Sequence, residues 1–230
     1  MAPIGRLTIA IPRQTQALAA LAVAALTSTE LLPTSDDYQH FATNVKPEWT
    51  AKFTFGKVPA FESIDGLVLT EGIAIARYFA ARAGRTDLLG KTIVDAALVD
   101  MWTSFAYTEL WPLLMRHTLV SNSYVPYPGQ DTVDGINQHA DRALEALNRH
   151  LILQKDKSEQ FIATAYLTVV DLTVVAMLRA GFGNFIDAQR RKRWPELKVY
   201  TERVLEDPIL ADVYGVIEYC EEASSYVPKV

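Results

Sequence analysis

The stretch FGKVPAFESIDGLVLTEGIAIARYFAAR, residues 55 to 82, decides the fold of the first part of this 230-residue chain. Pro59 lies between two short apolar runs. Because proline cannot donate a hydrogen bond to a sheet ladder, it predicts a sheet edge or a special bend. Asp65-Gly66 has the form of a two-residue hairpin turn between a strand that starts at Ala60-Phe61 and a returning strand at residues 67–69.

The residues that follow predict a helix with a binding corner at its start. Apolar side chains recur at helical spacing from Ile73 to Ala80, so Thr70 or Glu71 lies near the start of the helix. Free N–H groups at a helix start attract a carboxylate. A small ligand with a carboxylate and an ammonium group suits this corner, with Glu71 on the ammonium and the Gly72 N–H on the carboxylate. The alternative is an acid that only complements the helix dipole.

The motifs GKVPAFE, DG and LTEGIAIARYFA resemble the glutathione-binding half of cytosolic glutathione transferases, most closely the transferase-like domain of the elongation factor one gamma subunit. The resemblance implies that the Val58 backbone pairs with the cysteinyl part of glutathione, that Pro59 is cis, and that Glu71 holds the γ-glutamyl end. The family usually has Glu-Ser where this chain has Glu71-Gly72. We therefore expect glutathione to lose one hydrogen bond, worth about 1 kcal/mol.

The resemblance implies an α/β thioredoxin-like N-terminal domain followed by an all-α C-terminal helical bundle. In agreement, residues 6–11 predict a short strand, Pro12 a break, and the alanine-rich run 16–26 a helix. Only Glu30-Leu31-Leu32 offers a further strand. We assign residues 1–84 to the thioredoxin-like domain.

Residues 85–91 are the expected linker, and residues 92–230 the helical domain that lines the substrate site, because their apolar residues follow helical spacing without strand alternation. Thr168 to Asp171 has the form of a capping box ahead of an apolar run. It resembles the structural signature of the family and predicts a folding role. The expected helices span residues 94–119, 132–153, 169–180, 195–205 and 208–223.

Composition limits the partners. The net charge of −5 and the pI near 5.4 argue against nucleic acid, because phosphate binding needs concentrated Lys and Arg. We expect the one basic cluster, residues 190–193, to be a solvated helix end. Cys220 is the only cysteine, which excludes an intrachain disulfide and cysteine-based redox or zinc chemistry. We expect no metal.

The run from Ala17 to Leu26 has the composition of a signal-peptide core but is too short to span a bilayer. Its removal would delete the first strand and helix of the binding domain that the resemblance implies. We therefore expect a cytoplasmic protein without membrane association. Family members are mostly dimers, which implies a homodimer.

If glutathione binds, its thiolate is the reactive species, and a free thiol with a pKa near ~8.5 is only about 3% thiolate at pH 7. Family members lower that pKa with a Tyr, Ser or Cys in the turn after the first strand. By spacing from Pro12, the usual serine position falls on Gln14, with Thr15 the only hydroxyl and Arg13 the only cation nearby. These three residues are the catalytic candidates. The alternative for Thr15 is a helix N-cap.

Asn44, Lys46 and Lys57 are candidates for binding the glycine carboxylate of glutathione. The pocket for a small hydrophobic electrophile is expected between the turn at Gln14 and the helix that follows the linker. A structural or surface role is the alternative for its histidine. The pocket candidates are Tyr107, Trp111, Met115 and His117.

Three functions are compatible with these residues. The first is a glutathione transferase that conjugates the thiolate to an apolar electrophile, or adds it reversibly to an activated alkene so that rotation and elimination isomerise the alkene. The resemblance implies secondary-metabolite biosynthesis or detoxification. The second is a non-catalytic interaction module like the elongation factor domain. Against this alternative, the 230 residues lack the Lys-rich linker and the extra domain of that subunit. We therefore expect a stand-alone, fungal-like member of the family. The third is a hydrophobic-ligand binding protein.

Overall fold

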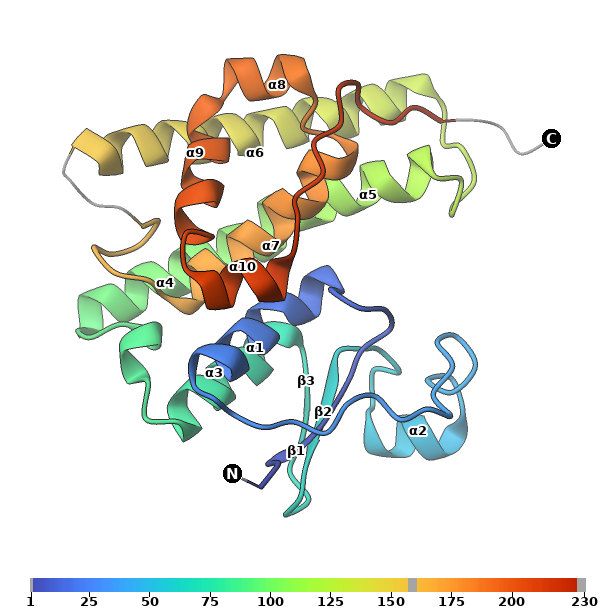
Figure 1. Ribbon diagram of the computed structural model, residues 1–230. Helices are drawn as coiled ribbons and strands as arrows, with labels where there is room; N and C mark the ends of the chain where they lie inside the picture. The colour runs from blue at the N-terminus through green and yellow to red at the C-terminus, as the bar shows by residue number, and fades with distance from the viewer. Residues whose placement is uncertain (1, 157–160, 227–230) are drawn as a thin grey trace.

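The computed structural model describes residues 2–156 and 161–226, which form two parts, one with a small sheet and one made of helices (Figure 1). The first part contains β1 (Gly5–Thr8), α1 (Thr15–Leu26), α2 (Pro47–Lys52), β2 (Ala60–Ser63), β3 (Val68–Thr70) and α3 (Gly72–Arg82). A 3₁₀ helix, η1 (Thr86–Leu89), connects the parts. The second part contains α4 (Ile93–Phe105), η2 (Ala106–Leu110), α5 (Trp111–Ser121), α6 (Gln130–Asp156), α7 (Val169–Asn184), α8 (Ala188–Arg193), α9 (Pro195–Val204) and α10 (Pro208–Tyr214).

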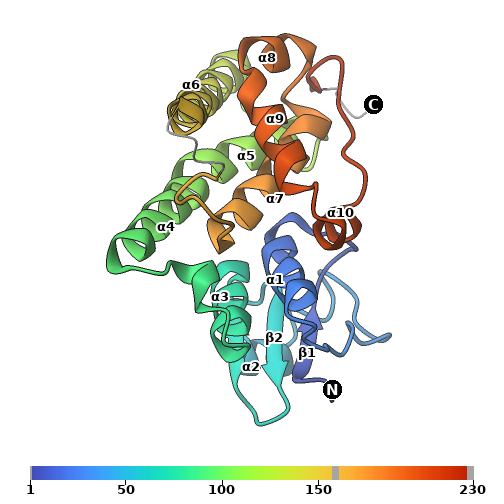
Figure 2. The ribbon, with the colours of Figure 1, turned by 60° about the vertical axis from the view of Figure 1, so that its left-hand side comes forward.

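The sheet has the order β1-β2-β3 and both pairs are antiparallel. Leu7 pairs with Phe61, and Phe61 pairs with Leu69. The further strand expected near Leu32 is reduced to a single parallel bridge between Arg6 and Leu32. Helices α1 and α3 pack against each other and lie between the sheet and the helical part (Figure 2).

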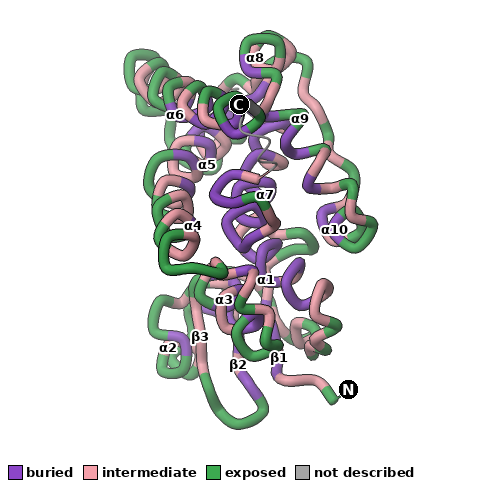
Figure 3. Tube along the Cα trace, turned by 90° about the vertical axis from the view of Figure 1, so that its left-hand side faces the viewer, coloured by how far each residue is buried: buried purple, intermediate pink, exposed green. Residues whose placement is uncertain are grey.

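Helix α1 joins the two parts. It packs on α3 in its own part and on α7 and α10 in the other. Its small side chains permit this close approach on several faces, and buried residues follow the lengths of α1 and α7 (Figure 3). The buried residues of α1 are Ala17, Leu18, Ala19, Ala20, Ala22, Val23 and Ala24. Within residues 2–156 and 161–226, no helix is both long enough and apolar enough to cross a bilayer.

The capping box predicted at the start of α7 is confirmed. The Asp171 carboxylate accepts hydrogen bonds from the Thr168 N–H and hydroxyl, each at 2.8 Å. It also accepts from the Ile162 N–H at 2.9 Å and the Tyr200 hydroxyl at 2.8 Å. The carboxylate therefore joins α7, α9 and the segment before α7 inside the core, which is a folding role.

One helix was predicted for residues 94–119, but the structure divides this segment. Pro112 has no N–H and cannot continue the regular hydrogen-bond ladder. Instead, the Trp111 N–H bonds to the Ala106 carbonyl five residues back, which makes η2 a π-helical turn. Turns of this kind occur often at functional sites.

The helix predicted for residues 208–223 is shorter than expected. Helix α10 ends at Tyr214 because Gly215 adopts a φ of 66°, where glycine is favoured. The chain from Gly215 onward then runs beside the C-terminal half of α7. The Cys220 N–H bonds to the Phe182 carbonyl, and the Ser224 N–H to the Asn184 carbonyl, each at 2.8 Å.

The expectation of a solvated helix end at residues 190–193 was wrong for two of the four residues. The side chains of Arg190 and Arg191 are only 19% and 15% exposed. Arg190 Nε donates to Asp141 of α6 at 2.7 Å, and Arg191 Nη2 donates to Glu221 of the C-terminal segment at 3.0 Å. These arginines bind α8 to neighbouring segments, a role that charge pattern alone does not reveal.

Candidate functional site

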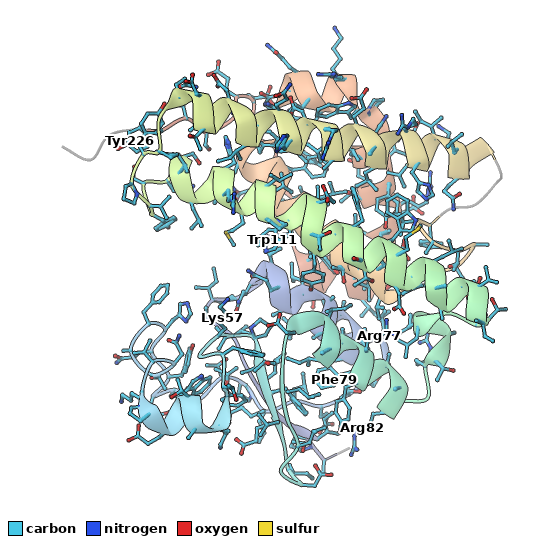
Figure 4. The ribbon with its side chains drawn as sticks, turned by 180° about the vertical axis from the view of Figure 1, so that it is seen from behind. Lys57, Arg77, Phe79, Arg82, Trp111 and Tyr226 are labelled. Atoms are coloured by element: carbon cyan, nitrogen blue, oxygen red, sulfur yellow. The ribbon has the colours of Figure 1, made fainter. Side chains whose placement is uncertain are left out.

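A cleft of about 200 Å³ lies where the two parts of the molecule meet. Figure 4 places Lys57 on the sheet side of this junction and Trp111 on the helical side. The cleft is formed by the loop before β2, the end of β3, the starts of α1 and α3, and the junction of η2 with α5. Its lining residues are Gln16, Lys57, Val58, Pro59, Thr70, Glu71, Gly72, Tyr107 and Trp111.

The bond between Val58 and Pro59 is cis, as the resemblance predicted. Val58 and Pro59 both line the cleft. The Val58 carbonyl accepts a hydrogen bond of 2.9 Å from Gln14 Nε2. Since a carbonyl oxygen has two lone pairs, this oxygen retains acceptor capacity for a bound peptide.

Glu71 stands at the sharp turn from β3 into α3. Its φ of 65° is unusual for a residue other than glycine, and such strain costs about 1 to 3 kcal/mol. Glu71 makes no side-chain capping hydrogen bond, so its exposed carboxylate does not serve the helix that it precedes. The first N–H groups of α3 and the free carboxylate thus offer complementary partners to a zwitterion.

Gly72 is buried between the starts of α3 and α1. A Cβ built on Gly72 would lie 1.7 Å from the carbonyl oxygen of Gln16 and 3.4 Å from Pro59 Cγ. No side chain fits in that space without a backbone shift. The departure from the usual Glu-Ser pattern therefore has a structural cause, which is the close approach of α1 to α3.

Two of the three catalytic candidates in the turn before α1, Gln14 and Arg13, bond to different parts of the protein. Gln14 bonds to the Val58 carbonyl through Nε2 and to the Ala10 N–H through Oε1, the latter at 2.8 Å. Arg13 donates instead to two carbonyls at the end of α10, those of Asp212 and Val213, at 3.2 and 3.3 Å.

The third candidate, Thr15, is the first residue of α1. The N-cap is Gln14, so the N-cap alternative for Thr15 was wrong. Of the three, Gln14 is the one that bonds directly to a residue of the cleft.

Tyr107 and Trp111 bring the π-helical turn and the start of α5 into the cleft. Burial raises the pKa of Tyr107 to about 12, and the negative charge of Glu71 contributes to the increase. The phenol therefore remains protonated near neutral pH and can donate a hydrogen bond. Tyr107 and Glu71 line the same cleft from opposite parts of the molecule.

The other candidates lie outside this cleft. Asn44 is buried, accepting from the Phe41 N–H at 2.6 Å and donating to the Gly56 carbonyl at 2.7 Å, so both ends of its amide serve the fold. Lys46 lines a separate pocket with Trp49. Met115 is not among the residues lining the cleft, and His117 lines a different cavity.

The sequence interpretation missed Gln16 and Thr70 as lining residues. Their residue types gave no signal, because the position of each depends on the fold: Gln16 lies in the first turn of α1, and Thr70 is the last residue of β3. The unusual glycine at position 72 was the one indication of a tight approach. Within the described part of the chain, no group of three or more His, Cys, Asp or Glu side chains is arranged to hold a metal ion.

Comparison with known proteins agrees with this architecture. The family model of the glutathione S-transferase N-terminal domain matches residues 8–81, and that of the C-terminal domain matches residues 115–213. The glutathione S-transferase-like protein LUC7 of Fusarium sp is 34% identical over 216 residues, which are 94% of each protein. Elongation factor 1-gamma of Sus scrofa is 30% identical over 191 residues, which are 83% of this chain but 42% of that protein.

Solved structures support the fold. The GST-like domain of elongation factor 1-gamma from Saccharomyces cerevisiae superposes with a TM-score of 0.81 at 20% identity, covering 99% of this chain and 100% of that one. Ure2p in complex with glutathione gives a TM-score of 0.77 at 15% identity, covering 92% and 98%. With both domains matched and a relative similar over nearly its whole length, the chain belongs to the glutathione S-transferase family.

Proposed function

We propose that this protein binds glutathione in the cleft and uses its thiolate on an apolar electrophile. The observation that carries the proposal is the convergence of cis Val58-Pro59, the uncapped start of α3 with Glu71, and the aromatic residues Tyr107 and Trp111 in one cleft. The first two supply polar partners for a small peptide. The aromatic residues provide an apolar wall beside them.

The charges of the cleft suit the charges of glutathione. In the proposed pose, the Glu71 carboxylate binds the γ-glutamyl ammonium, and the N–H groups of the first turn of α3 bind the adjacent carboxylate. The Val58 main chain pairs with the cysteinyl residue. In the same pose, Lys57 binds the glycine carboxylate, which is supported by its exposure in the preceding loop and its position in the lining of the cleft.

For thiol activation we propose Tyr107 as the hydrogen-bond donor. Gln14 and Arg13 already bond to carbonyls of the protein, and Thr15 is the alternative hydroxyl. A phenol with a raised pKa does not ionise at neutral pH, so it donates its hydrogen bond to the thiolate without losing its proton.

Two reactions follow from a stabilised thiolate. In conjugation, the sulfur forms a bond to an electrophilic carbon and the leaving group departs with its electron pair. In isomerisation, the sulfur adds to an activated alkene, the resulting single bond rotates, and elimination restores both the double bond and glutathione. We place either reaction in secondary-metabolite biosynthesis or detoxification, in the cytoplasm, on the basis of the family resemblance.

We further propose a homodimer that uses α4. Three apolar side chains of this helix are strongly exposed, namely Ile93 at 90%, Val94 at 67% and Met101 at 52%. Exposed apolar groups gathered on one helix are typical of an association surface. Sedimentation analysis of the protein and of a Val94→Glu, Met101→Glu variant tests this, since a dimer through α4 becomes monomeric in the variant.

Calorimetric titration with glutathione tests the binding site. Glu71→Gln removes the charge that binds the ammonium but keeps the side-chain size, so that we expect at least a tenfold loss of affinity. The matched control is Glu48→Gln, an exposed acid of α2 outside the cleft, which is expected to bind like the wild type.

The outcomes separate the alternatives. Glutathione binding that Glu71→Gln does not weaken would contradict the pose. The absence of binding up to millimolar glutathione would reject the enzyme and favour a non-catalytic module like the elongation factor domain, with which the fold agrees at a TM-score of 0.81. Binding without turnover of either chlorodinitrobenzene or a cis-enone would favour a hydrophobic-ligand binding protein.

A further inference from the structure

A second cavity, of about 560 Å³, lies in the helical part away from the cleft. It is enclosed by the C-terminal half of α5, the loop into α6, the first turns of α6 and the segment after α10. Figure 4 places Tyr226, which lines it, at the outer end of the helical part, well separated from Lys57. The lining residues are His117, Val120, Ser121, Tyr127, Gln130, Val133, Ile136, Asn137, Ala223, Ser224, Ser225 and Tyr226.

Helix α5 contributes to both sites but with different faces. Trp111 faces the cleft, whereas His117 lies six residues later, about 9 Å along the helix axis, and faces the cavity. The two sites therefore do not share a lining residue. A ligand in the cavity would leave the cleft free for glutathione.

None of the described residues that line the cavity is an acid, a lysine or an arginine. Its residues are apolar, aromatic, amide or hydroxyl side chains, together with His117. Burial lowers the pKa of His117, and the positive charge of Arg190 lowers it further, while the Asn137 hydrogen bond and the carbonyls of Asn184 and Ser224 act in the opposite direction. The net decrease keeps the imidazole neutral at pH 7.

His117 also carries an unsatisfied polar atom. The side chain is only 6% exposed, and its Nδ1 lies 3.0 Å from Asn137 Oδ1. Its Nε2 is buried and makes no hydrogen bond of normal geometry in the described part of the chain, although the carbonyls of Asn184 and Ser224 lie near the ring. A hydrogen bond from a bound hydroxyl group to this nitrogen would therefore be stabilising.

Defined contacts hold the outer wall of the cavity in place. The rings of Tyr127 and Tyr226 stack with centroids 4.5 Å apart and an interplanar angle of 18°. The Tyr127 hydroxyl donates to Gln130 at 2.7 Å, and the Ser224 N–H bonds to the Asn184 carbonyl at 2.8 Å. The cavity is therefore bounded by paired aromatic rings and a hydrogen-bonded segment of backbone.

We propose that this cavity binds an uncharged aromatic molecule that has a hydroxyl or carbonyl group. Val120, Val133, Ile136 and the tyrosine pair suit a planar apolar body, and the Asn137 amide and the His117 imidazole offer a polar anchor. An ion would lose its hydration without meeting an opposite charge. The volume lies in the range of roughly 300 to 1,000 Å³ that is typical of small-molecule sites.

Calorimetry on the full chain with naphthol tests the proposal, with naphthoate as the charged counterpart of the same ring system. We expect naphthol to bind at least tenfold more tightly than naphthoate at neutral pH. Val133→Trp fills the cavity and is expected to weaken naphthol binding at least tenfold. The matched control, Thr132→Trp, introduces the same side chain at the adjacent exposed position and is expected to bind normally.

For each variant we also measure the affinity for glutathione and the thermal unfolding temperature. Unchanged glutathione affinity in Val133→Trp shows that this variant is folded, and it separates the proposal for the cavity from the proposal for the cleft. If Val133→Trp unfolds, Ile136→Trp replaces it, because Ile136 lines the same cavity from the neighbouring turn. Equal naphthol affinity in the filled and control variants would overturn the proposal. So would naphthoate binding as tightly as naphthol, or naphthol being displaced by a glutathione conjugate that occupies the cleft.

Discussion

The side-chain amide of Gln14 connects the backbone of Val58 to the backbone of Ala10. Gln14 Nε2 donates a hydrogen bond to the Val58 carbonyl at 2.9 Å, and Gln14 Oε1 accepts one from the Ala10 N–H at 2.8 Å. One side chain thus fixes the turn before α1 against the cis-proline loop. By spacing, Gln14 stands where family members usually have a catalytic serine, and here the residue positions the peptide group that we propose pairs with glutathione.

Gln14→Ala removes both hydrogen bonds. We expect a loss of about 1 to 3 kcal/mol in the free energy of unfolding, because two backbone groups lose their partner. We also expect weaker glutathione binding. Denaturant unfolding and calorimetry measure the two effects, with Gln138→Ala on the exposed face of α6 as the control, expected within about 0.5 kcal/mol of the wild type. Identical behaviour of the two variants would show that the Gln14 bridge is unimportant.

Gly72→Ala tests whether the close approach of α1 excludes a side chain at the position of the family serine. The added Cβ meets the Gln16 carbonyl at 1.7 Å, so we expect destabilisation of at least about 1 to 3 kcal/mol. Gly135→Ala in α6 is the control, since nothing lies within 4 Å of its Cβ. There we expect stabilisation of up to about 1 kcal/mol from helix propensity. A Gly72→Ala protein as stable as the wild type would contradict the steric explanation.

Tyr107→Phe tests the proposed thiol donor. A hydrogen bond to a charged group is worth about 1.5 to 3 kcal/mol, so its loss is expected to raise the pKa of bound glutathione by about 1 to 2. Glutathione affinity at low pH, where the thiol is protonated, is expected to change little. Ultraviolet absorbance of the thiolate against pH gives the pKa. The same experiment on Thr15→Val decides between the two hydroxyls, and a larger effect there would reject Tyr107.

Arg190→Ala tests the contacts between α8 and α6. The variant loses the bonds to Asp141 and Asp187 and the stacking of the guanidinium 3.9 Å from the centroid of the Phe185 ring. Because these groups are mostly buried, we expect a loss of about 1 to 3 kcal/mol in the free energy of unfolding. Lys192→Ala, on the same helix and exposed, is expected to change stability by less than about 0.5 kcal/mol. Thermal or denaturant unfolding measures the stability of both variants. Equal stabilities would show that the basic cluster at residues 190–193 is only a solvated helix end.

The elements that could be predicted from the sequence depend on interactions between residues close together in the chain. The hairpin and α3 follow from Asp65-Gly66 and from apolar spacing between residues 73 and 80, and they form at β2, β3 and α3 as expected. The capping box at Thr168 was predictable because its two partners are three residues apart. The cleft residues Val58, Pro59, Glu71 and Gly72 belong to one continuous stretch, and they line one cleft together.

The sequence by itself determined the family, the hairpin with the helix that follows it, and the helical character of the second part, because turns, caps and helical periodicity act over a few residues. Only the tertiary structure decided which long-range partners meet. Arg13 reaches carbonyls about 200 residues away, His117 faces a second cavity instead of the cleft, and Gln16 excludes a side chain at position 72. Periodicity shows which face of a helix is buried but not what covers it, and that depends on how the two parts of the chain pack.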